Sequence, residues 1–167
     1  MSLTDDERNA IVSFRIQKAK DTLAEAEGIS TLKYWNAVAN RLHYSCFYMT
    51  SALLIQNNFS AQTHSGVIHL FGLHFIRTGV ISKDAGKLYS KLFELRQTGD
   101  YDDLFNLTEE DVAPMITLVH QFLDELNGKI TNYPANIVLK PDNIQKCIEV
   151  LQKHKLELVS ASEMYKI

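Results

Sequence analysis

The sequence has few of the residues that end helices or cross-link a chain. Among its 167 residues are 3 prolines, 7 glycines and 2 cysteines. Cys46 and Cys147 lie far apart, each within an apolar helical pattern, which predicts two buried, reduced thiols rather than a disulfide framework. No strand pattern, internal repeat or low-complexity tract is present. These absences favour an all-α protein of the cytoplasm.

The chain also lacks a large net charge and a membrane segment. Its formal net charge is −3, so any site for a polyanion has to be local. The start, MSLTDDERNA, does not have the basic-then-apolar layout of a signal peptide. Leu42 to Ile76 contains no Asp, Glu, Lys or Arg, but Gln56-Asn57-Asn58 interrupts the run after about 14 residues, short of the roughly 20 that span a bilayer. We therefore expect a soluble protein.

One stretch, YWNAVANRLHYSCFYMTSALLI, carries large apolar or aromatic residues on every side of a helix. Such a helix, Tyr34 to Ile55, is normally buried all round. Arg41 is its one formal charge, and arginine keeps its proton inside a protein. We therefore expect a fixed anionic partner, an interface or a ligand beside Arg41.

Capping and periodicity divide the rest of the chain. We predict a helix over 4–28, opened by a Thr4–Glu7 capping box, and one over about 65–77, closed by Gly79. A further helix is predicted over 82–98, closed by Gly99, and another over 108–130, with a kink or late start at Pro114. The last is predicted over about 142–160. Gly66 and Gly72 are expected to mark close approach of a neighbour. The first helix is expected to cover the core without a chemical role.

The predicted architecture is an all-α, up-and-down bundle of about five helices with a C-terminal helical arm. The bundle would span 1–131, and 132–167 would form an extended connection, which contains two prolines, and the last helix.

Three histidines in the third predicted helix do not form a metal site by their spacing. His64, His69 and His74 recur every five residues, a turn of about 140° per step, so they cannot converge on one ion. We expect hydrogen-bonding roles for them, and we expect no cofactor.

The segment RQTGDYDD, Arg96 to Asp103, reads as a connection with a turn and an acidic cluster. Asp102 and Asp103 fit a solvated connection. Asp100 and Tyr101 are better placed to tie the segment to the interior, and an ion pair between Asp100 and Arg41 is one way to do so.

Three ordered segments, AVANRLHYSCFYMTSALLI, THSGVIHLFGLHFIRTGVIS and LRQTGDYDD, resemble the HEPN-domain family, closest to its small stand-alone bacterial and archaeal type. The resemblance covers roughly residues 5 to 130 and implies a helical bundle that forms a homodimer with two copies of an arginine motif brought together. Many members are metal-independent ribonucleases and often toxins. Others are inactive modules that bind RNA or a nucleotide, often encoded beside a small nucleotidyltransferase.

The resemblance also assigns residues. Arg41 matches the arginine of the active signature, whereas Tyr48 stands where close relatives carry the histidine that moves the 2′-hydroxyl proton. A tyrosine with a pKa near 10 is a poor base at neutral pH. His43 lies about 200° around the helix from Arg41 and points away. His64, at the start of the second matching segment, is the better substitute.

Our leading hypothesis is a dimeric HEPN-like protein that binds RNA or a nucleotide in a groove around Arg41. Arg41 and Tyr48 lie nearly on one line with Tyr44 beside them, and arginine with aromatic rings suits a phosphate with stacked bases. Arg96, Asp100 and Tyr101 would complete the ligand-binding set.

Three alternatives stay open. Arg41 could pair with a carboxylate and only order the bundle. The protein could be an active ribonuclease that uses Arg41 with His64 or Tyr48. It could also serve as the interaction partner of a small nucleotidyltransferase. The arm after Tyr133 could bind a partner or clasp a dimer.

Overall fold

The computed structural model describes residues 3–101 and 106–130, with side chains described through Gln97 in the first range. These ranges contain helices and no strand: α1 (Asp5–Ser30), α2 (Trp35–Gln56), α3 (His64–Phe71), the π-helix η1 (Gly72–Ile76), α4 (Lys83–Tyr101) and α5 (Glu109–Lys129). The prediction of an all-α fold is confirmed.

Helix α1 begins where its capping residues predict. The Thr4 hydroxyl accepts a hydrogen bond from the Glu7 amide, and the Glu7 carboxylate accepts one from the Thr4 amide at 2.9 Å. The predicted end at Gly28 is wrong, because α1 continues to Ser30. Gly28 does not adopt the left-handed backbone that ends helices, and Lys33 (φ 61°) supplies it instead in the turn to α2.

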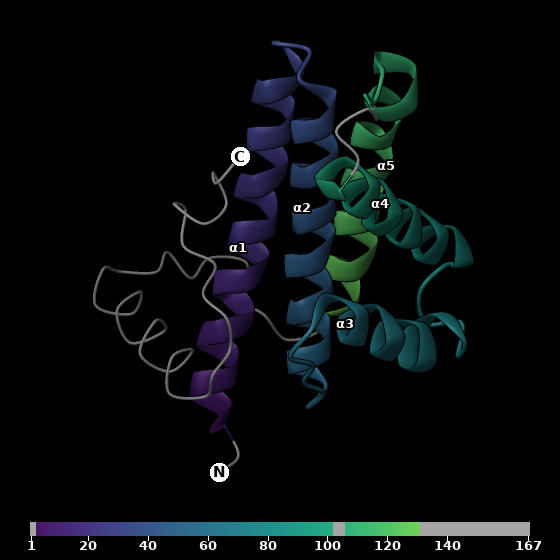
Figure 1. Ribbon diagram of the computed structural model, residues 1–167. Helices are drawn as coiled ribbons and strands as arrows, with labels where there is room; N and C mark the ends of the chain where they lie inside the picture. Colours follow the sequence, from purple (N-terminus) through teal and green to yellow (C-terminus); the bar gives the residue numbers. More distant parts are fainter. Residues whose placement is uncertain (1–2, 102–105, 131–167) are drawn as a thin grey trace.

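Helix α2 is the centre of the fold. It lies beside the antiparallel α1 and also contacts α3, α4 and α5 (Figure 1). From Val38 to Ile55 every residue is buried except Asn40 and Phe47, which confirms the predicted all-round burial. The Ser45 hydroxyl donates to the Ala19 carbonyl of α1 at 2.8 Å. The helix ends at the predicted asparagines, where Asn58 has a φ of 62°.

The helix predicted over 65–77 divides into two parts. After α3, the Arg77 amide donates to the Gly72 carbonyl at 2.9 Å, the five-residue step of a π-helix. Gly79, with a φ of 75°, ends the segment as predicted. A Cβ on Gly66 would lie 3.0 Å from Thr63 Oγ1, so the crowding comes from its own helix cap. The predicted close approach at Gly72 is wrong, since a Cβ added there would meet no neighbour within 4 Å among the described residues.

The last two described helices start at their caps but differ from prediction elsewhere. Helix α4 passes through Gly99 and is described as far as Tyr101, so the predicted end at Gly99 is wrong; glycine accepts helical as well as left-handed backbone. Its start is tied to α5 by Glu125, which accepts hydrogen bonds from the Ser82 amide and hydroxyl at 2.7 and 2.9 Å. Helix α5 begins at Glu109, before Pro114, so the predicted late start is wrong.

Several predictions fall on other parts of the chain. The extended connection, the arm over 132–167 and Cys147 lie outside the described residues. Cys46 is a buried free thiol, as predicted, and burial raises its pKa. None of the helices that the structure describes has a stretch long and apolar enough to cross a membrane.

Candidate functional site

Arg41 lies inside the bundle with 5% of its surface exposed. Its Nη1 is 3.6 Å from the Glu25 carboxylate of α1, and its Nη2 donates to the Asn40 side chain at 2.8 Å. The predicted anionic partner is therefore Glu25, whereas the side chain of Asp100, the partner suggested by the sequence, lies outside the described part. Helix α1, to which the sequence analysis assigned no chemical role, supplies this carboxylate.

Helix α1 also supplies a second buried arginine that the sequence reasoning missed. Arg15 is 6% exposed, and its Cζ lies 5.4 Å from the centre of the Tyr48 ring. The sequence contained a pattern that could have predicted the burial of Arg15. Arg15 shares a stripe of spacings four, three and four with Ala19, Thr22 and Ala26, all of which are buried. A charge within such a stripe predicts a buried arginine.

Tyr44 is the meeting point of two further arginines. The Cζ of Arg41 lies 5.4 Å from the centre of the Tyr44 ring, and the Cζ of Arg96, from α4, lies 5.0 Å from it. The Tyr44 and Tyr48 rings are 6.1 Å apart. Each such cation–π contact is worth about 0.5 to 2 kcal/mol, depending on how far water is excluded.

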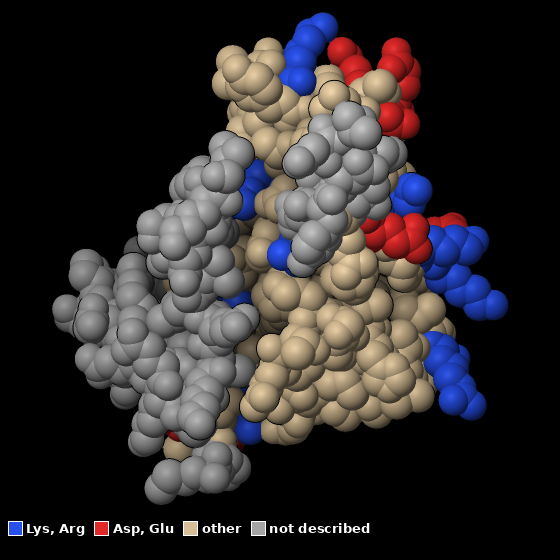
Figure 2. Space-filling model, in the orientation of Figure 1, with Lys and Arg blue, Asp and Glu red and all other residues tan. Residues whose placement is uncertain are grey.

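We call this group the arginine–tyrosine cluster; it consists of Arg15, Arg41, Tyr44, Tyr48 and Arg96. Its three guanidinium groups come from α1, α2 and α4. Figure 2 shows small Lys and Arg surfaces along the middle of the face where α1 and α2 lie in Figure 1, and further Lys and Arg side chains together with acidic ones at the top and along the right edge. The cluster thus brings three guanidinium groups together in a chain whose net charge is −3.

His64 lies at the edge of the cluster. As the first residue of α3, it stacks on Phe47 with ring centres 4.2 Å apart, and it meets Tyr44 edge-on at 5.4 Å. His43, set aside in the sequence reasoning because it faces away from Arg41, is fully buried and lies next to it. The Nε2 of His43 is 3.2 Å from Nδ1 of His64.

The surroundings keep both histidines neutral. Burial, the repulsion that a second protonated ring at His64 would cause, and the charge of Arg96 lower the pKa of His43 to about 3. Burial, with Arg96 and Arg15, lowers the pKa of His64 to about 4. Burial raises the pKa of Tyr48 above its usual 10, although Arg15 and Arg41 oppose the shift. At neutral pH Tyr48 is therefore a phenol, and it is no better a base than the sequence predicted.

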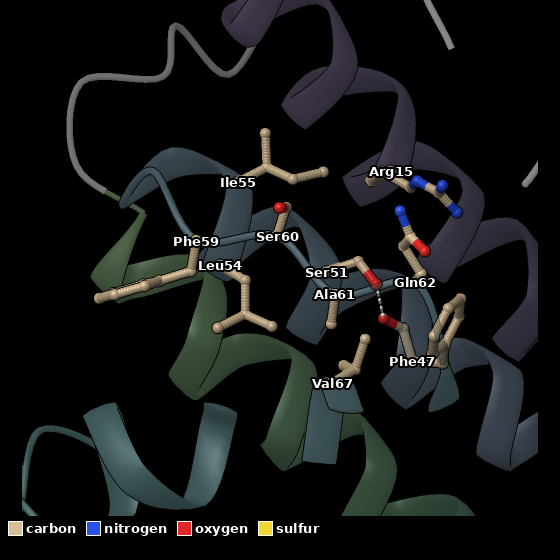
Figure 3. Close-up of a pocket in the computed structure, with 10 residues that line it drawn as sticks. All are labelled: Arg15, Phe47, Ser51, Leu54, Ile55, Phe59, Ser60, Ala61, Gln62 and Val67. Carbon is tan, nitrogen blue, oxygen red and sulfur yellow. Dashed lines mark hydrogen bonds between the residues drawn. The ribbon is translucent and has the colours of Figure 1, made fainter. Parts of the chain in front are cut away.

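A small cavity adjoins the cluster, and its volume is about 40 Å³. Arg15 and Phe47 belong to both the cavity wall and the cluster's surroundings. Figure 3 shows the Arg15 guanidinium and the Gln62 amide facing each other on one side, with Leu54 and Val67 below. The Ser51 hydroxyl in this wall donates to the Phe47 carbonyl at 2.7 Å. The enclosed space is sized for a few water molecules rather than a nucleotide.

Two predicted site residues and the other two histidines of the second matching segment complete the picture. Asp100 and Tyr101 lie on the last turn of α4, and their side chains are outside the described part. His74 stacks on Phe59 at 4.0 Å, and His69 is exposed. Among the described residues, no group of three or more His, Cys, Asp or Glu could hold a metal ion.

Comparison with known proteins gives consistent relatives. A UPF0332 protein of Thermotoga maritima is 35% identical over 125 residues, which is 75% of this chain and 95% of that protein. Two proteins of Methanocaldococcus jannaschii, named "Putative toxin MJ0605" and "Putative toxin MJ0142", are 31% and 28% identical over 66% of this chain and 82% and 75% of their own lengths. The family model for the HEPN domain matches residues 12–130. This chain, from α1 through α5, therefore belongs to the HEPN domain family.

Proposed function

We propose that this protein binds single-stranded RNA at the arginine–tyrosine cluster and does so without efficient cleavage. The observation that carries the proposal is the convergence of Arg15, Arg41 and Arg96, from three helices, on the rings of Tyr44 and Tyr48. Guanidinium groups bind phosphate oxygens in pairs, and aromatic faces stack on bases for about 1 to 3 kcal/mol each.

The accessible edge of the cluster is formed by Phe47, His64 and Arg96, which are half-buried. Arg41 lies behind them, held by Glu25 and Asn40. A phosphate would meet Arg96 first, while the fixed position of Arg41 would orient the deeper contact. Because His43 and His64 are neutral at pH 7, the positive charge of this site comes from its arginines.

The ion pair with Glu25 also fits the alternative in which Arg41 only orders the bundle. Binding of a fluorescently labelled single-stranded RNA, followed by anisotropy, separates the two. Arg41→Gln should weaken binding about tenfold or more, as expected for a lost phosphate contact of a buried cation. Arg77→Gln, at an exposed arginine outside the cluster, is the matched control and should stay within about twofold of wild type. Equal affinities of Arg41→Gln and wild type would leave Arg41 a structural residue.

A second candidate function is metal-independent ribonuclease activity. His64 beside Tyr44 favours it, since a neutral imidazole could take the 2′-hydroxyl proton while Arg41 and Arg96 hold the phosphate. Two relatives are named as toxins of unproven status, which is compatible with it. The low pKa of His64 weakens it as a base, so we favour binding. Incubation with transfer or messenger RNA in chelator, with Arg41→Gln and His64→Gln as controls, decides between them.

We further propose that two copies of the chain associate with their clusters facing each other. The support is the family relationship and the burial of Arg41 rather than any contact between copies. A small nucleotidyltransferase as partner stays a prediction, and co-purification from cells that carry both genes would test it.

A further inference from the structure

The hydrogen bond between His43 and His64 determines which nitrogen of His64 carries its proton. Only the last step, the effect on RNA binding, rests on the proposed function. The two rings share one hydrogen bond, Nε2 of His43 to Nδ1 of His64 at 3.2 Å. In neutral imidazoles one of these nitrogens must donate and the other accept. Both histidines are neutral at pH 7, as their lowered pKa values show.

The surroundings of His43 decide the direction of this bond. The ring is fully buried between Tyr44, Tyr89 and Phe93, with centres 5.5, 5.7 and 5.7 Å away. Its other nitrogen, Nδ1, has no hydrogen-bond partner among the described residues. A buried N–H without an acceptor is rarer and costlier than a buried lone pair without a donor. The proton of His43 therefore belongs on Nε2, where it has an acceptor.

We propose that His43 is a positioning residue that fixes His64 as a hydrogen-bond donor. Nε2–H of His43 donates to Nδ1 of His64, so the single proton of His64 is held on Nε2. The stacking of Phe47 and the edge contact of Tyr44 fix the plane of the His64 ring. His64, which is itself half-buried, thus carries its N–H on the nitrogen that is not bonded to His43, and this N–H would complement Arg96 in binding a phosphate oxygen.

The position of the single proton on the His64 ring decides whether His64 can donate a hydrogen bond to an anion or act as a general base. A general base for the 2′-hydroxyl needs a lone pair on the nitrogen that faces the substrate. On His64 the lone pair is on Nδ1 and is used by His43. The resting site is therefore arranged to donate hydrogen bonds to an anion rather than to remove a proton.

Nitrogen-15 NMR of the full-length protein with labelled histidine tests the assignment directly at pH 7, because protonated and unprotonated ring nitrogens have well separated shifts. We expect the His64 proton on Nε2. A His64 proton on Nδ1 would overturn the proposal whatever the protein binds. His43→Gln retains a side-chain amide donor and should preserve the Nε2–H form, whereas His43→Phe should allow both forms of His64.

Binding of the same labelled RNA supplies the functional arm. His43→Phe should weaken it about threefold to tenfold, the value of one hydrogen bond, and His43→Gln should restore most of the loss. His69→Phe, at an exposed histidine of α3, is the control. If wild type shows no RNA affinity, the proposed function fails and the tautomer result stands alone. If wild type binds and the His64 proton is on Nδ1, the inference fails and the function survives.

Discussion

Neutral histidines in the interior link the folding of this protein to pH. Burial among aromatic rings removes water from an imidazole. The loss of water costs the charged form much more free energy than the neutral form, so burial favours the neutral form. His43 and His64 follow this rule, with pKa values of about 3 and about 4 in the folded state. In the unfolded chain both return to about 6.5.

The first prediction concerns stability between pH 7 and pH 5. As pH falls below 6.5 the unfolded chain takes up protons that the folded state excludes, so stability is full above pH 6.5 and is lost toward the folded pKa values. Below pH 6 the free energy of unfolding should fall toward a limiting slope of about 1.4 kcal/mol per pH unit for the buried His43, and by no more than that for the half-buried His64, with a shallower slope between pH 7 and 6. Urea unfolding at pH 7, 6 and 5 measures it, before most carboxylates titrate.

His64→Gln is the control for this prediction, because it leaves one of the two histidines and should reduce the slope to about half. A slope that does not change between wild type and variant would show that the pair does not titrate as described.

At the residue scale the sequence predicted that the charge of Arg41 is buried, but not which side chains surround it. The burial of Arg41 follows from α2 alone, since a helix that is apolar all round has no solvent face. Its partner could not be predicted, because Glu25 reaches it only through the register of α1 against α2. His43 was set aside for a similar reason. It reaches the site through its contact with His64 of α3, and the sequence of α2 alone cannot predict a contact with another helix.

At the element scale, the interhelical ion pair is the feature that joins structure to the proposed site. Glu25 on α1 is 29% exposed and Arg41 on α2 is 6% exposed, counted over their side chains. Removing one partner of a buried pair leaves the other charge uncompensated, and partial exposure of Glu25 reduces that cost.

We therefore predict that Glu25→Gln lowers the free energy of unfolding by about 1 to 2 kcal/mol, measured by urea titration. RNA affinity should stay equal or rise, because the variant removes a negative charge beside Arg41. Glu27→Gln is the matched control, since Glu27 on the same helix forms an exposed pair with His120 at 2.8 Å. It should cost under about 0.5 kcal/mol. A loss of RNA affinity in Glu25→Gln, with the fold intact, would contradict the assigned roles.

Helix starts were predicted better than helix ends. The Thr4 and Thr108 capping boxes work through side-chain atoms that the sequence names. Gly28 and Gly99, by contrast, are compatible with both ending and continuing a helix, and in the structure α1 and α4 continue through them. The π-helix η1 after α3 could not be predicted either, because no residue type in it distinguishes a π-helix from an α-helix in the apolar periodicity.

At the scale of the whole molecule, a net charge of −3 provides no overall positive field that would attract RNA. Binding then depends on a local site, and a second copy would double the number of guanidinium groups in reach of one strand. We predict a homodimer. Light scattering coupled to gel filtration should give 2 × 19.0 = 38.0 kDa for this 19.0 kDa chain. A mass of one chain at micromolar concentration would remove the facing groove and leave the cluster of a single copy.

The measurement that tests the RNA site most directly is photo-crosslinking of the full-length protein to single-stranded RNA that contains 4-thiouridine, followed by tryptic mapping. Because no Lys or Arg lies between Arg41 and Arg77, one peptide, 42–77, carries Tyr44, Phe47, Tyr48 and His64. We predict crosslinks on these aromatic residues, and their loss in Arg41→Gln, where trypsin releases residues 34–77 as one peptide and the crosslinked residue is located within it by fragmentation. Crosslinks confined to other peptides, such as the neighbouring one with the exposed Tyr34, would contradict the proposed site.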